Sequence, residues 1–147
     1  MKAVIQRVSQ ASVSVKGTVT GHISRGLLVL LGVGHDDNQE DLDILVRKIP
    51  KLRIFNDEQG KMNLSLADVG GSILAVSQFT LFGTWRRGNR PGFTDAAAPE
   101  KGERMYEQFI SMIREKDICV ETGVFGAMMN VELVNEGPAT FVIDTKS

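Results

Sequence analysis

Two short segments contain the groups with which this sequence could do chemistry. The first is Ser77-Gln78-Phe79-Thr80-Leu81, which ends a strand-like run and sets the hydroxyl of Thr80 beside the amide of Gln78. The second is Gly137-Pro138, between two strand-like runs. Glycine imposes no Cβ, and proline fixes φ, donates no hydrogen bond and can follow a cis peptide bond. In the second segment the working groups could therefore be main-chain carbonyls.

The residues alone leave structural roles open for both segments. A threonine without an activating base is a poor nucleophile, and Thr80 has no base near it in the sequence. A threonine at a strand end more commonly satisfies local backbone groups. A Gly-Pro pair is ordinarily a turn with a trans bond, because only about 5–6% of X-Pro bonds in folded proteins are cis.

Other catalytic equipment is scarce. The only histidines are His22 and His35, and no HExxH or CxxC pattern is present, so we expect no metal site. A Ser-His-Asp triad remains possible in space, but no serine lies in a nucleophile-elbow pattern. The single cysteine, Cys119, excludes an internal disulfide, and its apolar neighbours predict a buried side chain. Gly32-Val33-Gly34 lacks the third glycine of a dinucleotide fingerprint, and we expect no cofactor.

The composition predicts one globular domain spanning residues 1–147. The chain has 147 residues, of which 42% are hydrophobic and 24% charged, enough for one core and few for two. No apolar run has the length of a membrane span, and Lys2 and Arg7 interrupt the alternating N-terminus where a signal peptide would be continuously apolar. We therefore expect a cytoplasmic protein that makes no membrane contact.

The formal net charge of −1 argues against nucleic-acid binding by bulk electrostatics. Any RNA contact must be local, and the suitable stretch is residues 84–92, with Arg86, Arg87, Arg90, the only tryptophan (Trp85) and no acid. A solvated surface loop is the alternative interpretation, because short basic clusters are common.

The apolar patterning predicts an α+β fold: a mainly antiparallel, barrel-like sheet with two principal helices. One helix carries Leu42, Leu45, Val46 and Ile49 on one face and should end near Pro50; the other begins at Pro99 and carries Met105, Phe109, Met112 and Ile113. Strands are expected at 3–8, 12–15, 19–23, 26–33, 73–79, 118–121, 128–134 and 140–143.

The chain resembles the D-aminoacyl-tRNA deacylases (the D-tyrosyl-tRNA deacylase family), which hydrolyse the ester between tRNA and a misattached D-amino acid or glycine. The likeness runs over essentially the whole chain, through residues 1–8, 60–63, 77–81, 93–97, 122–126 and 133–140. It implies a homodimer with both active sites at the subunit interface. In it, Gly137-Pro138 is cis and enters the partner's pocket, whose wall the Ser77–Leu81 segment forms.

The resemblance also implies how handedness is read. An enzyme that accepts many D-amino acids must test the α-carbon, and carbonyls at Gly137 and Pro138 can meet the α-amino group and crowd the place of an L side chain. Glycine has no side chain to exclude, so glycyl-tRNA should be hydrolysed as well as D-aminoacyl-tRNA.

Further site residues follow from the same resemblance. Arg7 matches an arginine that steadies the Gly-Pro segment, and Phe125 and Met129 match positions that hold the terminal adenosine; a strand-edge charge and two core residues are the structural alternatives. The terminal ribose hydroxyl is implied to activate water or attack, with backbone groups of Phe79 and Thr80 holding the oxyanion. Thr80 as a covalent nucleophile is the rival mechanism.

The chain departs from the family pattern at Glu136 and Ala139, where Asp and Val are usual, and in residues 82–85 and 92. Two other functions stay open. One is a noncatalytic RNA or peptide binder that uses the arginine loop and a dimer groove. The other is a threonine-dependent esterase or amidase that acts on small molecules.

Overall fold

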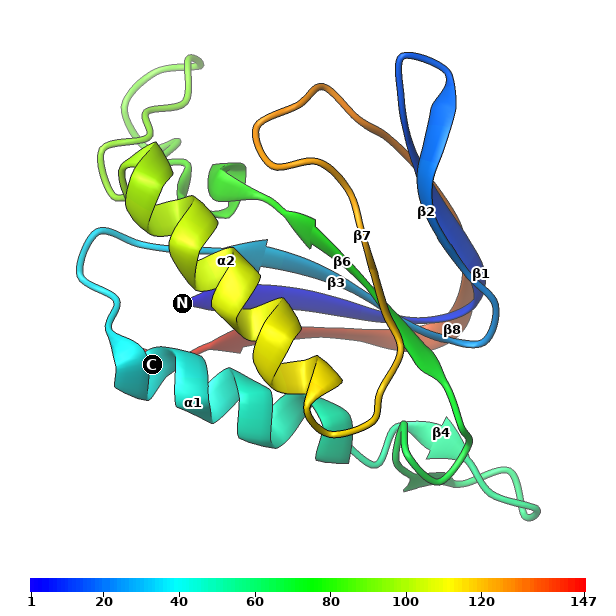
Figure 1. The fold of residues 1–147 in the computed structure, drawn as a ribbon. Coiled ribbons are helices and arrows are strands. Elements are labelled where there is room, and N and C mark those ends of the chain that lie inside the picture. The colour runs from blue at the N-terminus through cyan, green and yellow to red at the C-terminus, as the bar shows by residue number, and fades with distance from the viewer.

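A six-stranded mixed sheet organises the chain in the computed structural model, which describes residues 1–147 (Figure 1). The strand order is β2-β1-β3-β6-β7, and β8 pairs with the other side of β1. The strands are β1 (Lys2–Val15), β2 (Thr18–Ile23), β3 (Gly26–Gly32), β6 (Ser72–Ser77), β7 (Val120–Thr122) and β8 (Asn130–Asp144), and β4 (Phe55–Asn56) and β5 (Met62–Leu64) form a separate small hairpin.

The long first strand makes the sheet curl. β1 pairs antiparallel with β3 through Lys2–Val8 and with β2 through Ala11–Val15, and β8 runs antiparallel along nearly its whole length. β3, β6 and β7 are mutually parallel. At the far edge β2 approaches β7 so closely that a Cβ on Gly21 would lie 2.7 Å from the Thr122 carbonyl oxygen. The sheet is therefore nearly closed, and the predicted barrel-like α+β fold is confirmed.

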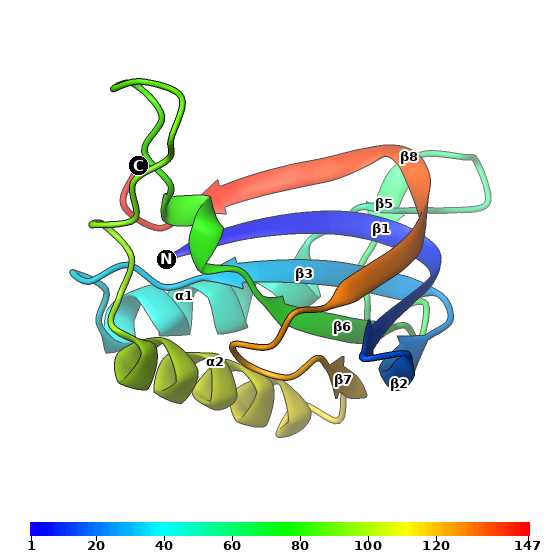
Figure 2. The same ribbon diagram turned by 90° about the horizontal axis from the view of Figure 1, so that it is seen from above.

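Both helices lie on one side of the sheet, as Figure 2 shows. Helix α1 (Gln39–Lys48) begins at Asn38, whose side chain accepts from the N–H groups of Glu40 and Asp41 while Asp41 accepts from the Asn38 N–H. It passes at Ile49 into the 3₁₀ turn η1 (Ile49–Lys51), where Pro50 interrupts the α-helical hydrogen bonding.

Helix α2 (Pro99–Arg114) begins at the predicted proline. Its side chains Met105, Phe109 and Ile113 are buried, and Met112 is half-buried. They pack with the apolar face of α1 against β1, β3 and β6 in a cluster of 22 buried residues. A second, separate cluster consists of seven buried residues: Val8, Ala11, Val13, Ile23, Leu28, Leu74 and Val76. The buried apolar faces predicted for both helices are confirmed.

Three local predictions were wrong. The strands predicted at 3–8 and 12–15 form the single strand β1, and those predicted at 128–134 and 140–143 form β8, which begins at Asn130, because β1 and β8 pair along both halves of each other. Gly137-Pro138 consequently lies within β8 rather than in a turn between strands. Cys119 is exposed because it precedes the edge strand β7, where Val120 turns into the core instead.

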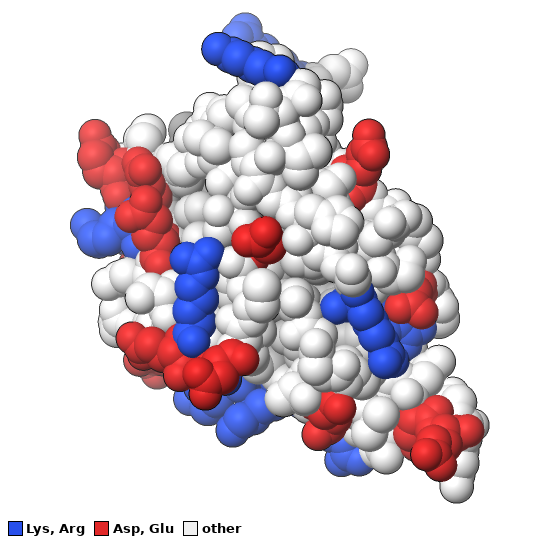
Figure 3. All heavy atoms as spheres, turned by 45° about the vertical axis from the view of Figure 1, so that its right-hand side comes forward, with Lys and Arg blue, Asp and Glu red and all other residues white.

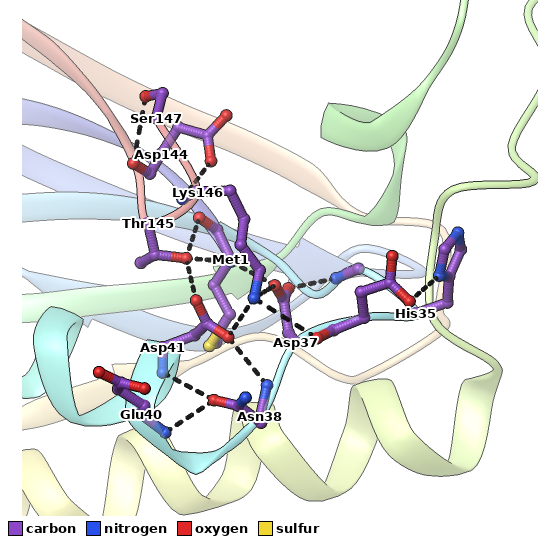
Figure 4. A network of polar contacts seen from close by, with 12 residues as sticks. Met1, His35, Asp37, Asn38, Glu40, Asp41, Asp144, Thr145, Lys146 and Ser147 are labelled. Atoms are coloured by element: carbon purple, nitrogen blue, oxygen red, sulfur yellow. Dashed lines mark hydrogen bonds and ion pairs between the residues drawn. The ribbon is translucent and has the colours of Figure 1, made fainter.

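A polar network ties the two chain ends to the start of α1 (Figure 4). The Met1 ammonium donates to Asp37 Oδ1 at 2.7 Å, and the Thr145 hydroxyl donates to Asp41 Oδ1 at 2.7 Å. Lys146 Nζ donates to Asp41 Oδ2 at 2.9 Å. Burial opposes ionisation of Asp41, but the hydrogen bonds from Thr145, Asn38 and Lys146 outweigh it and hold the pKa of this carboxyl well below its usual range.

Acidic and basic side chains are interspersed on the face in Figure 3, with no extended field of one sign. This distribution agrees with the near-zero net charge. Neither helix has the length and apolar character needed to cross a bilayer.

Candidate active site

An apolar cavity of about 530 Å³ opens at the carboxyl end of β6. Ser77, Gln78 and Phe79 line one side, and Phe125 and Met129 line another. Its volume falls in the range of small-molecule sites, roughly 300–1,000 Å³. The remaining lining residues are Val33, Val76, Phe93, Ala96, Ala97, Pro99, Gly102, Gly126, Ala127 and Val131.

The buried strand β6 positions the first wall. It lies between β3 and β7 with Ile73–Val76 buried, and the chain then turns sharply: the Gln78 N–H donates to the Leu31 carbonyl at 2.8 Å, and a 3₁₀ turn, η2 (Phe79–Phe82), follows. The rings of Phe79 and Phe93 meet edge to face with centroids 5.1 Å apart. Phe79 is therefore held at the cavity rim by a second aromatic ring.

Thr80 is exposed and does not line the cavity. Its hydroxyl accepts a hydrogen bond from the Gln78 side-chain amide, and no basic side chain contacts it. No side chain caps η2, so the first N–H groups of this turn, those of Phe79 and Thr80, have no capping partner. This segment therefore offers two free backbone N–H groups, and the Thr80 hydroxyl has no base to activate it.

A buried tyrosine supports the opposite wall. The ring of Tyr106 lies 6.1 Å from that of Phe125, and its hydroxyl donates to the Ala75 carbonyl at 2.7 Å. Burial raises the pKa of Tyr106 to about 12, so the hydroxyl stays protonated and keeps donating to β6. No sequence motif marks Phe93, Gly102 or Tyr106 as site residues. Tyr106 follows Met105 on the apolar face of α2, and this position predicts burial only.

Gly137 and Pro138 lie in a large, irregular bulge of β8. Gln6 pairs with Thr140 and Val8 with Asn135, so the four residues 136–139 lie opposite Arg7 alone. The Gly137-Pro138 peptide bond is cis. Both residues are exposed, while Ala139 is fully buried and anchors the bulge.

Arg7 is the buried support of this bulge. Only 5% exposed, it donates from Nε to the Glu136 carbonyl at 3.2 Å and from Nη2 to the Gly137 carbonyl at 3.4 Å. Nη1 donates to the Ile54 carbonyl at 2.7 Å and to Asn56 Oδ1 at 3.2 Å. Its planar fork thereby links the bulge to the β4 segment. The alternative interpretation of Arg7 as a charge at a strand edge is wrong, because the side chain is buried and β1 is paired on both sides.

The structure thus separates the predicted residues into two groups. Ser77, Gln78, Phe79, Phe125 and Met129 share the cavity, with Thr80 next to it. Arg7, Gly137 and Pro138 do not line it, and they form the braced bulge instead.

Comparison with known proteins identifies the family. The family model for D-Tyr-tRNA(Tyr) deacylase matches residues 4–144. The D-aminoacyl-tRNA deacylases of Koribacter versatilis and Anaeromyxobacter dehalogenans are each 58% identical over 146 residues, covering 99% of this chain and 98% of theirs. That of Thermotoga petrophila is 56% identical over 145 residues, covering 99% of this chain and 97% of its own.

Two solved structures share the fold. The c-Myc DNA Unwinding Element Binding Protein superposes with a TM-score of 0.91 at 42% identity, covering 98% of both chains. A probable eukaryotic D-amino acid tRNA deacylase superposes with a TM-score of 0.76 at 21% identity, covering 97% of this chain and 98% of its own. With matches over nearly its full length, the chain belongs to the D-aminoacyl-tRNA deacylase family, whose members are hydrolases of tRNA esters.

Proposed function

We propose that this protein hydrolyses the ester between a D-amino acid, or glycine, and the terminal ribose of tRNA, and that it spares L-aminoacyl-tRNA. The observation that carries the proposal is the pairing, in one chain of this family, of an open apolar cavity at Ser77–Phe79 with an exposed bulge at Gly137-Pro138 that a buried arginine braces. The reaction belongs to the proofreading of translation, which takes place in the cytoplasm.

The bulge is the proposed chiral filter. Main-chain carbonyls at Gly137 and Pro138 accept from the α-amino group of the substrate and fill the space where an L side chain would project. A D side chain points elsewhere, and glycine has none. Arg7 contributes by fixing the Glu136 and Gly137 carbonyls, because a filter that works by excluding the L side chain needs a rigid backbone.

The active protein is proposed to be a homodimer in which each bulge enters the cavity of the partner. Gly137 and Pro138 lie outside their own chain's cavity and are exposed, so a second copy is the natural way to unite the two groups. β8 is an edge strand with Val134 48% and Val142 73% exposed on either side of the bulge. Apolar side chains along an unpaired edge favour association.

The ester is proposed to be cleaved with help from the RNA. The terminal ribose hydroxyl activates a water, the water oxygen attacks the ester carbon, and the ester C–O bond breaks to leave free tRNA and the amino acid. Backbone N–H groups of Phe79 and Thr80 donate to the developing oxyanion. Phe125 and Met129 hold the terminal adenosine. This mechanism needs no basic side chain beside Thr80 and calls on no cofactor.

The decay of matched D- and L-tyrosyl-tRNA, with glycyl-tRNA alongside, tests the proposal under catalytic amounts of protein. Rapid loss of the D and glycyl esters with the L ester spared is the expected result. Loss of all three at one rate would contradict the filter, and persistence of all three would leave a noncatalytic binder. Hydrolysis of simple D-amino esters that lack RNA would indicate a small-molecule esterase instead.

A further inference from the structure

Residues 84–92 form a closed, exposed hairpin loop. Thr84 and Gly92 exchange backbone hydrogen bonds of 2.8 and 2.9 Å, and every residue from Thr84 to Pro91 is exposed. The loop stands out from the sheet beyond the end of β6 in Figures 1 and 2. The proposed catalytic chemistry uses none of its side chains.

The charge of this hairpin is uncompensated. Arg86, Arg87 and Arg90 make no ion pair or hydrogen bond in the structure, and no acidic residue lies between Thr84 and Gly92. Lys2 adds a further cation at the base, with Nζ 4.7 Å from the centre of the Phe82 ring. In a protein with a net charge of −1, this is a local basic site suited to a polyanion.

The hairpin also presents a flat stacking surface. Trp85, the only tryptophan, is 69% exposed, and the Arg86 guanidinium lies 4.8 Å from the centre of its ring. Both groups border an open hollow of about 390 Å³ together with Arg87 and Thr94. An exposed indole with a stacked guanidinium is the kind of surface on which unpaired nucleic-acid bases stack.

The hairpin is continuous with the active-site cavity. Phe93 follows Gly92 directly and packs edge to face on Phe79, and both rings line the cavity. A ligand whose end lies in the cavity therefore has the basic hairpin next to its exit.

We propose that the hairpin 84–92 binds the acceptor end of the tRNA, with the three arginines on its phosphates and the Trp85–Arg86 pair under an unpaired base near the 3′ terminus. This rests on the proposed function, because it assumes that the 3′-terminal adenosine occupies the cavity. RNA is favoured over an acidic peptide because a peptide would use the charges but leave the stacking surface unused.

The single tryptophan allows a direct binding test that needs no turnover. Uncharged tRNA, titrated into the wild-type protein over a range of salt concentrations, should change the Trp85 fluorescence, with affinity falling as salt rises. In the Arg86→Gln/Arg87→Gln/Arg90→Gln variant, affinity should fall at least about tenfold. The negative slope of log K against log salt should become shallower by about 2–3, since each phosphate contact contributes roughly 0.7–0.9 to its magnitude.

A matched control separates local contacts from overall charge. Arg47, Lys48 and Lys51 are also exposed; the first two lie at the end of α1 and the third in η1, away from the hairpin (Figure 1). Changing all three to Gln removes the same charge and should leave affinity and salt slope near wild type. Equal weakening in both triple variants, an unchanged Trp85 signal, or displacement of tRNA by equimolar polyglutamate would overturn the proposal.

Hydrolysis rates on two substrates distinguish RNA binding by the hairpin from deacylation itself. If the protein is a deacylase, the arginine variant should raise KM for D-tyrosyl-tRNA with little change in kcat, and it should hydrolyse 3′-D-tyrosyl-adenosine, which has no phosphate, like the wild type. If the wild-type protein hydrolyses neither substrate, the deacylase proposal fails, while the fluorescence result still decides whether the hairpin binds RNA.

Discussion

The guanidinium of Arg7 lies 3.4 Å from the carbonyl oxygen of Gly137, although the two residues are 130 positions apart in the chain. The same side chain reaches the Ile54 carbonyl, so one buried fork joins β1, the β8 bulge and the β4 segment. The position of an exposed carbonyl is thereby made dependent on a residue in the core.

Arg7→Lys should lower both stability and deacylation. A single ammonium cannot replace a fork that makes four hydrogen bonds, and a buried carbonyl left without its donor costs about 1–3 kcal/mol in the free energy of unfolding. Loss of carbonyl alignment should reduce kcat/KM on D-tyrosyl-tRNA by about a hundredfold. Denaturant unfolding and hydrolysis rates measure the two effects. Arg47→Lys, on the exposed side of α1, should change neither.

Gly137→Ala should leave the fold intact and reduce activity. A Cβ at this position would meet only Asn135 Oδ1, at 3.8 Å, so the free energy of unfolding should change by no more than about 0.5 kcal/mol. If the bulge enters a partner's cavity, the added methyl group meets the substrate there and should lower the rate on D-tyrosyl-tRNA by about tenfold or more. Wild-type rates in a folded Gly137→Ala protein would count against the filter.

Thr80→Val should retain most of the activity. The substitution removes the hydroxyl and keeps the shape, so with RNA-assisted hydrolysis the rate should fall by about tenfold or less, whereas loss of a covalent nucleophile costs several orders of magnitude. Single-turnover hydrolysis of D-tyrosyl-tRNA distinguishes the two. A tRNA that ends in a deoxyribose should resist the wild-type enzyme, and rapid hydrolysis of that substrate would rule out ribose participation.

Gly102→Ala should stabilise the protein and weaken substrate binding. Gly102 lies inside α2, where alanine is favoured by about 0.5–1 kcal/mol, and an added Cβ would make ordinary contact with the Phe125 ring at 3.4 Å. Since Gly102 also lines the cavity, the methyl group narrows it, and KM should rise. The melting temperature and KM should therefore both rise, whereas the exposed Glu103→Ala control should not raise KM.

Asp41→Asn should destabilise the protein in a pH-dependent way. The folded-state pKa of Asp41 lies below its unfolded value of about 3.9, so its contribution is present above pH 4 and is lost as the pH falls toward the folded pKa. We expect the variant to be less stable by about 1.5–3 kcal/mol near neutral pH, and we expect this difference to narrow as the pH falls below 4. Asp43→Asn, exposed on the same helix, should show no such narrowing when urea unfolding is measured from pH 7 to pH 3.

The amino-acid sequence by itself determined the local features of this protein. Alternating apolar residues specify the two halves of β1, the run Gly26–Gly32 specifies a strand buried on both faces, and Asn38 and Pro99 start the two helices, because these signals act within a few residues of chain. The segments Ser77–Thr80 and Gly137-Pro138 could be singled out for the same reason, from side-chain and backbone chemistry that is local.

Only the tertiary structure decided how these pieces meet. That Arg7 is buried beneath Gly137, that Tyr106 supports Phe125, and that 136–139 bulge from one continuous strand all depend on pairing between β1 and β8 and on packing of α2 over β6. The apolar neighbours of Cys119 predict a buried side chain, but they do not reveal which strand lies at an edge of the sheet, and Cys119 is exposed there. Long-range pairing is set by the sum of many weak contacts across the sheet, and no short stretch of residues contains that information.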